Sequence, residues 1–194
     1  MTIDSQETGH TLQRHKAVKR FQLMDVDQDG HITRADYENL IQRLLDAYPA
    51  QQGTPAADRL RQSYLKLWRA LAYSSDADGD GKVTQEEFVN AVISGLVNRS
   101  GGFDRAIKPV AQAVLELADS DGTQTLSLPE FTKLFETFGV SAEEAGQSFK
   151  ALDVNGDGQL TSEEIIAANH AFYLSDSPAD PANLLFGRYS AEPT

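Results

Sequence analysis

One twelve-residue pattern occurs four times in this chain of 194 residues, and it constrains the fold more than any other feature. Each copy carries oxygen-bearing side chains at positions 1, 3, 5, 9 and 12, and an aliphatic residue at position 8. A single segment of twelve residues rich in Asp and Gly could be a solvated turn, but four copies indicate a repeated structural unit. The copies are residues 25–36 (DVDQDGHITRAD), 76–87 (DADGDGKVTQEE), 119–130 (DSDGTQTLSLPE) and 153–164 (DVNGDGQLTSEE).

The spacing matches what a hard divalent cation needs. Ca²⁺ takes six to eight oxygen ligands at about 2.3–2.6 Å. A tight loop can aim side chains inward from positions 1, 3 and 5, add the carbonyl of position 7, and end with a carboxylate at position 12. Glycine at position 6 permits the left-handed turn between the two halves of the loop. The predicted metal ligands, with position 7 contributing backbone, are Asp25, Asp27, Asp29, His31 and Asp36; Asp76, Asp78, Asp80, Lys82 and Glu87; Asp119, Asp121, Thr123, Thr125 and Glu130; and Asp153, Asn155, Asp157, Gln159 and Glu164.

Positions 9 and 12 of every loop form a Ser/Thr-x-x-acid pair, which is the sequence pattern of a helix capping box. The pairs are Thr33 with Asp36, Thr84 with Glu87, Ser127 with Glu130, and Thr161 with Glu164. This pattern predicts that each exit helix begins at position 9. Apolar residues recur every three or four positions on both sides of each loop, so both flanks are predicted to be helical. Two further helix starts are predicted at Thr54-Pro55 and at Ser141 with Glu144.

These units predict an all-α fold with four helix-loop-helix motifs in two pairs, packed into one compact globule. Loop one is expected to pair with loop two, and loop three with loop four, through short two-stranded antiparallel bridges at position 8. The Gly-rich segment 98–102 predicts a division into residues 1–98 and residues 99–194, the second part carrying the C-terminal tail.

The four loops are not expected to bind metal equally. Loops two and four should bind most readily, since each has glycine at position 6 and Glu at position 12. Loop one ends in Asp36, which is one methylene shorter than Glu, and it is expected to accept Mg²⁺ better. Loop three has the uncharged Thr123 at position 5 and Gln124 at position 6, where a left-handed backbone costs a non-glycine residue about 1 kcal/mol. Weaker binding is expected there.

With these motifs the chain resembles the sarcoplasmic calcium-binding protein family of the EF-hand superfamily, including its bacterial calerythrin-like members. The resemblance covers about residues 10 to 175 and rests on four loops, their uneven spacing and the long insert between loops one and two. It implies a compact globule of two EF-hand pairs packed face to face, and a role in Ca²⁺/Mg²⁺ buffering. In that family the second loop is often degenerate, whereas here the third loop is the irregular one.

Composition excludes several classes of function. The formal net charge of −12, from 29 acidic and 17 basic residues, argues against nucleic-acid binding, which needs a basic surface. The absence of cysteine excludes disulfides and thiolate metal sites. No apolar run approaches the roughly 18 residues of a membrane span, and no signal pattern is present. We therefore expect a cytoplasmic monomer without membrane contact, with metal ions as its expected partners and no assigned protein partner.

The chemistry expected is binding rather than catalysis, because the four histidines show neither metal-ligand nor triad spacing. A buffer is favoured over a sensor, since a sensor exposes a Met-rich groove and this chain has two methionines. Residues 183–189 could also fill such a groove from within. The alternative is a Ca²⁺ sensor that exposes a hydrophobic surface to a partner. A resemblance to the coelenterazine-binding photoproteins is possible, because they share this architecture, but the single tryptophan, Trp68, and the lack of a His/Trp/Tyr set argue against it. The basic helix around Arg14, His15, Lys16, Lys19 and Arg20 could touch an acidic partner or a membrane, but a solvated face is the favoured prediction.

Overall fold

Side-chain caps determine where most of the helices begin. The computed structural model describes residues 10–76 and 79–187. Within these ranges five helices begin with a reciprocal capping box, in which the N-cap hydroxyl and an acid three residues later satisfy each other's backbone N–H groups. Their N-cap residues are Thr33, Thr84, Ser127, Ser141 and Thr161. The predicted helix starts are confirmed, including the one at Pro55 with Thr54 as N-cap.

The elements follow one another with short connections. Here η1 and η3 are 3₁₀ turns, and η2 is a π-helical continuation of α4. In chain order the elements are α1 (Thr11–Met24), β1 (His31–Ile32), α2 (Arg34–Ala47), η1 (Pro49–Gln51), α3 (Pro55–Ser75), β2 (Val83–Thr84), α4 (Gln85–Val92), η2 (Ile93–Val97), α5 (Gly102–Ala106), α6 (Lys108–Ala118), β3 (Thr125–Ser127), α7 (Leu128–Thr137), α8 (Ala142–Leu152), β4 (Gln159–Thr161), α9 (Ser162–Leu174) and η3 (Pro181–Leu184).

The loops pair as predicted, through two short antiparallel ladders. Strand β1 pairs with β2, which places Ile32 opposite Val83. Strand β3 pairs with β4, which places Leu126 opposite Leu160. All four of these position-8 side chains are buried, so each ladder is fixed to the hydrophobic core beneath it.

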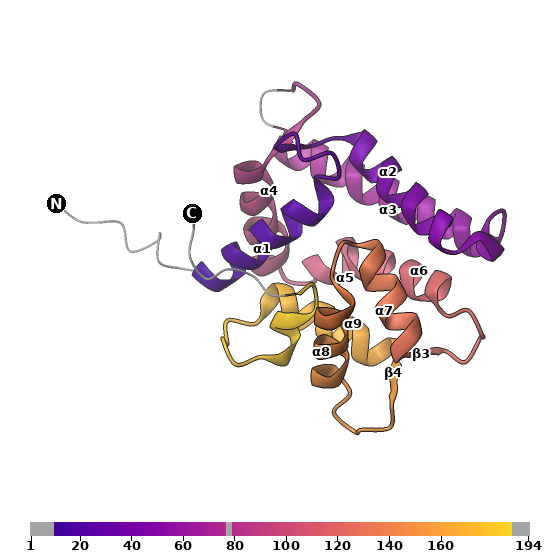
Figure 1. The fold of residues 1–194 in the computed structure, drawn as a ribbon. Coiled ribbons are helices and arrows are strands. Elements are labelled where there is room, and N and C mark those ends of the chain that lie inside the picture. The colour runs from indigo at the N-terminus through magenta and orange to yellow at the C-terminus, as the bar shows by residue number, and fades with distance from the viewer. Residues whose placement is uncertain (1–9, 77–78, 188–194) are drawn as a thin grey trace.

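The two halves of the chain share one hydrophobic core. Figure 1 shows the N-terminal helices α1 to α4 gathered above the C-terminal helices α5 to α9. Between the halves, α3 contacts α6, α2 contacts α7 and α1 contacts α9. A single cluster of buried side chains runs through both halves. The predicted all-α globule of paired motifs is confirmed, while the exact division at residues 98 and 99 stays a prediction.

The chain crosses between the halves at η2 and α5, and it does so with very close backbone contact. A Cβ built on Gly102 would lie 2.0 Å from the carbonyl oxygen of Gly95, so this crossing has no room for any other residue type at position 102. Gly101, just before it, has φ +66, a conformation that glycine adopts without strain.

The C-terminal segment covers helix α1, and this corrects one expectation. Lys16 is 0% exposed; its Nζ donates to the carbonyl oxygen of Ser175 at 2.7 Å and to Oδ1 of Asn183 at 3.2 Å. Arg20 is 8% exposed. The predicted solvated face is therefore wrong for both residues, because η3 and the chain around it return to pack on this helix.

Leu185 and Phe186 are buried, so the predicted filling of a groove from within holds for this part of the tail. Residues 188 and 189 of the same predicted segment lie outside the described ranges. Within the part of the chain that is described, none of the helices combines the length and the apolar character needed to cross a bilayer.

Candidate metal centres and an internal cavity

In each loop the backbone wraps around the side chain of position 1, whose carboxylate accepts several backbone N–H groups. In loop four, Asp153 accepts backbone N–H groups from Gly156 at 2.9 Å, Asp157 at 3.2 Å and Gly158 at 3.0 Å. The equivalent carboxylates accept the N–H groups of positions 5 and 6 in the other loops; they are Asp25, Asp76 and Asp119. These bonds hold the turn in shape and keep one carboxylate at the centre of the loop.

Positions 3 and 5 are oriented by the same kind of local bond. Asp80 accepts the N–H of Lys82 at 2.8 Å, and Asp157 accepts that of Gln159 at 2.9 Å. In loop one, Asp29 accepts the N–H of His31 at 2.9 Å. The predicted carbonyl ligands of position 7 begin the strand in loops one, three and four, at His31, Thr125 and Gln159. In loop two, Lys82 lies just before β2 (Val83–Thr84) and is not part of the ladder.

The position-12 acid joins the end of each loop to its exit helix. Glu87 and Glu164 each accept the N–H and the hydroxyl of the position-9 threonine, at 2.8–2.9 Å. In loops one and three the same acid also reaches back to position 2. Asp36, which is 1% exposed, accepts the N–H of Val26 at 3.0 Å, and Glu130 accepts that of Ser120 at 3.2 Å. In these two loops one carboxylate therefore ties both ends together.

Two groups of acids have oxygens spaced for one cation. In loop one, Asp25, Asp27 and Asp29 each offer an oxygen, and these oxygens lie within 4.8 Å of one another. In loop three, Asp119, Asp121 and Glu130 do the same. Ligands on opposite sides of a Ca²⁺ ion are about 4.6–5.2 Å apart, so the spacing within both groups is compatible with such an ion. The oxygens of Asp36 lie outside the loop-one group, whereas Glu130 belongs to the loop-three group.

In loops two and four, no such group of three acids is found among the residues that the structure describes. Loop four has Asn155 at position 3, whose side-chain oxygen accepts the N–H of Asp157 at 2.9 Å. In loop two, Asp78 at position 3 lies outside the described residues. The expectation that these two loops bind most readily stays a prediction.

Left-handed backbone at two loop positions separates the loops into two kinds. Positions 4 and 6 both have positive φ, and glycine occupies both in loops two and four. Gln124 at position 6 of loop three has φ 64, as expected from the sequence. Gln28 at position 4 of loop one has φ 60, which the sequence analysis missed although the other three loops have glycine there. Loops one and three each contain one strained residue of this kind.

Two acids of loop three, Asp121 and Glu130, are held in the charged form. The Thr123 side chain and backbone, which hydrogen-bond to Asp121, lower the pKa of that carboxyl. Burial by itself raises the pKa of Glu130, but hydrogen bonds from Ser120 and Ser127 outweigh it and lower the pKa overall. Both groups are therefore ionised at neutral pH, as a metal ligand must be.

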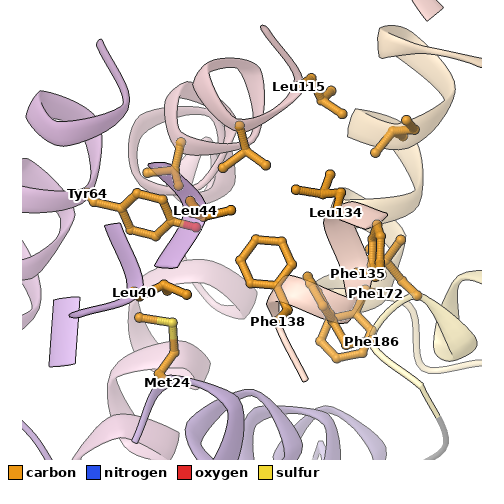
Figure 2. Close-up of a cluster of buried hydrophobic side chains, with 14 of the residues drawn as sticks. Met24, Leu40, Leu44, Tyr64, Leu115, Leu134, Phe135, Phe138, Phe172 and Phe186 are labelled. Atoms are coloured by element: carbon orange, nitrogen blue, oxygen red, sulfur yellow. The ribbon is translucent and has the colours of Figure 1, made fainter. Parts of the chain in front are cut away.

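A second candidate site is a cavity of about 920 Å³ between the two halves. Residues from α1, α2, α3, α4, α6, α7 and α9 line it, and it opens toward the surface beside α3 and α5. Figure 2 shows Met24 and Tyr64 on one side of this region and Leu134, Phe138 and Phe186 on the other. The cavity is not predictable from the sequence, because its lining residues come from many segments and follow no single periodicity.

Paired helix-loop-helix units whose loops present clustered carboxylates define a protein of the EF-hand class. Two family models match the chain: an EF-hand domain pair over residues 14–93 and an EF hand over residues 147–167. These ranges contain the first, second and fourth loops, and the irregular third loop lies between them.

Two relatives are similar in sequence to this chain over most of its length. Calerythrin of Saccharopolyspora erythraea is 29% identical over 158 residues, which is 80% of this chain and 89% of calerythrin. The luciferin-binding protein of Renilla reniformis is 27% identical over 188 residues, 95% of this chain and 97% of that protein.

Among solved structures, a calcium-binding protein of Streptomyces coelicolor described in terms of calcium-mediated regulation superimposes with a TM-score of 0.73. It is 28% identical, and the match covers 85% of this chain and 99% of that one. The sarcoplasmic calcium-binding protein of amphioxus shares the fold at a TM-score of 0.71 and 17% identity, over 91% and 98% of the two chains. The chain therefore carries EF-hand domains, and its similarity to calerythrin and to the Streptomyces coelicolor protein supports a place among the calerythrin-like calcium-binding EF-hand proteins.

Proposed function

We propose that this protein is a cytoplasmic Ca²⁺/Mg²⁺ buffer without enzymatic activity. The observation that carries the proposal is that Leu185 and Phe186 of the C-terminal tail are buried, in a segment that packs on helices α8 and α9 of the C-terminal pair. Phe186 packs against Phe172 with ring centroids 4.9 Å apart, and against Phe135 at 5.9 Å. A sensor needs a hydrophobic groove that Ca²⁺ exposes to a partner. A protein that covers this hydrophobic surface with its own side chains is suited to binding ions without signalling to a partner.

The twenty predicted ligands would hold the ions, with carboxylates at the centre of each loop. Fourteen of them are Asp or Glu side chains, out of the 29 acidic residues in the chain. Four divalent ions would bring the formal charge from −12 to about −4. The bound ion neutralises acids that otherwise repel one another, so metal is expected to stabilise the fold by mass action.

Loops two and four would bind Ca²⁺ most tightly, because their left-handed positions are glycines and their last ligand is Glu. Loop one, which ends in Asp36, would favour Mg²⁺, and loop three would bind weakly because Gln124 is strained.

Calorimetric titration with Ca²⁺, with and without Mg²⁺, tests the ligand assignment. Glu87→Gln and Glu164→Gln keep an oxygen for the capping box but remove the charge, and each should lower the Ca²⁺ affinity of its loop about tenfold or more. Glu144→Gln is a matched control, because Glu144 closes the same kind of capping box outside any loop. Equal titrations of all three variants would contradict the assignment.

The buffer role is tested on a phenyl matrix, to which Ca²⁺ sensors bind in Ca²⁺ and from which they elute in EDTA. We expect the same weak retention in both conditions. Strong Ca²⁺-dependent retention would instead support the alternative function, a Ca²⁺ sensor that offers a hydrophobic surface to a partner protein.

The cavity supports a second candidate function, the binding of a hydrophobic small molecule. Its volume of about 920 Å³ falls in the range of about 300–1,000 Å³ that is usual for ligand pockets. One relative is by name a luciferin-binding protein, which is consistent with a ligand site in this fold. Native mass spectrometry of the purified protein tests this candidate: a bound organic molecule would support it, and failure to take up any hydrophobic compound would contradict it.

A further inference from the structure

The charge of the internal cavity is opposite to that of the protein. Four basic residues line the cavity, and no Asp or Glu is found among its lining residues in the described ranges; the four are Arg20, Lys66, Arg99 and Arg105. The protein as a whole has a formal charge of −12. A cavity that collects cations and excludes acids in so acidic a chain is electrostatically suited to an anion.

Arg20 is the innermost of these cations, and no acidic side chain within residues 10–76 and 79–187 forms an ion pair with it. Its Nη1 is buried and has no hydrogen-bond partner in the described structure. Its guanidinium carbon lies 4.7 Å from the centroid of the Phe186 ring and 5.6 Å from that of Phe138. A buried charge without an opposite charge costs several kcal/mol, so this guanidinium is the group that an incoming anion would most stabilise.

The groups around Arg20 are polar but uncharged. Burial by itself lowers the pKa of Arg20, but the oxygens of neighbouring tyrosines raise it above its ordinary value; they are Tyr173, Tyr64 and Tyr37. Burial raises the pKa of all three hydroxyls. At neutral pH the site therefore holds one cation and three neutral hydroxyls. The hydroxyls can donate hydrogen bonds to a bound anion, but they cannot neutralise the charge of Arg20 as an anion would.

The remaining cations lie where the cavity opens. Lys66, Arg99 and Arg105 are exposed, on α3 and around the start of α5. Arg105 Nη2 donates to the carbonyl oxygen of Ser100 at 2.8 Å, which fixes its position. Exposed cations contribute little to affinity, but they steer anions toward the opening.

We propose that the cavity binds an amphipathic organic anion, with its carboxylate at Arg20 and the tyrosine hydroxyls and its hydrophobic body against the apolar lining. This inference rests on the second candidate function and adds the chemical class of the ligand. The Phe138 ring centroid lies 5.6 Å from the guanidinium carbon of Arg20, and Leu134 and Phe135 line the same cavity, so one molecule would use both kinds of contact.

The test compares two ligands of the same chain length, decanoate and decanol, on the full Ca²⁺-loaded protein, below the concentration at which calcium soap separates. We expect decanoate to bind about tenfold or more tightly than decanol, as a charged hydrogen-bonded contact in a dry site would give. In Arg20→Met this preference should fall to about threefold or less, while decanol affinity stays the same. Arg34→Met is the control, because Arg34 pairs with Glu38 on the surface and does not line the cavity.

Three results would overturn the proposal. Equal binding of the two ligands to the wild type would remove the anion preference but leave a hydrophobic-ligand site. Binding of neither ligand would overturn this proposal and the second candidate function together. A decanoate preference that persists in Arg20→Met would show that another group recognises the carboxylate. The wild-type comparison is informative even if Arg20→Met does not fold.

Discussion

Phe186 offers a sharp test of the claim that the C-terminal tail belongs to the core. Its ring is 5% exposed and meets Phe172, Phe135 and Phe138 at centroid distances of 4.9, 5.9 and 6.4 Å. It also lies 4.7 Å from the guanidinium carbon of Arg20. Phe186→Ala removes all of these contacts at once and enlarges a cavity that it already borders.

Truncating a buried Phe to Ala costs about 3–5 kcal/mol. Because one side of the Phe186 ring faces the existing cavity, we expect the lower end of this range, about 3 kcal/mol. In a chain of this size each kcal/mol shifts the Tm by about 2–4 °C, so the Tm should fall by about 6–12 °C.

The measurement is thermal unfolding by circular dichroism in saturating Ca²⁺. Leu128→Ala is the control: Leu128 is 39% exposed, and its loss should cost about 0.5 kcal/mol or less. A Tm change in Phe186→Ala no larger than that of the control would refute the reasoning. The tail would then lie on the protein without holding it together, and the buffer proposal would lose its main support.

Further predictions concern stability and ion selectivity. Burial lowers the pKa of Lys16 from 10.5 to about 8, so the unfolded chain binds more protons between these values. Stability should therefore rise with pH from about 8 to 10.5, and denaturant titrations should show less of this rise in Lys16→Met. Gly102→Ala should cost about 3 kcal/mol through its backbone clash, whereas Gly146→Ala, in a helix with open space, should stabilise by about 1 kcal/mol. Gln124→Gly should stabilise by about 0.5 kcal/mol net, since relief of left-handed strain exceeds the added flexibility; an unchanged Tm would argue against strain in loop three. Asp36→Glu should shift loop one toward Ca²⁺ over Mg²⁺ in competition titrations, and unchanged selectivity would contradict the role given to side-chain length.

The features that the sequence predicted correctly are those determined within a few residues. A capping box needs only Thr161 and Glu164 on the same turn, and the ladder register follows from the position-8 residues Leu126 and Leu160. Local spacing is enough to specify both. The one local error was Gln28, whose left-handed backbone could have been read from the glycines at position 4 of the other loops.

What the sequence did not reveal depends on contacts between distant segments. Lys16 is buried because Ser175 and Asn183, more than 150 residues away, accept its hydrogen bonds. Arg20 is buried by the same return of the chain. On the helix alone both residues belong to a basic stretch, which ordinarily faces water. The cavity could not be predicted for the same reason, because no single helix contributes enough of the lining residues to form a recognisable sequence pattern.

The β3–β4 ladder has a consequence for how ions are taken up. Thr125 lies opposite Thr161 and Leu126 opposite Leu160, so loops three and four share one strip of backbone. If loop four binds its ion first, that ion would order β4, and β4 would in turn order the second half of loop three. Part of the conformational entropy that loop three loses on becoming ordered is then already lost before the loop binds its own ion. The C-terminal pair should fill cooperatively, and its irregular loop should bind more tightly within the pair than it would alone.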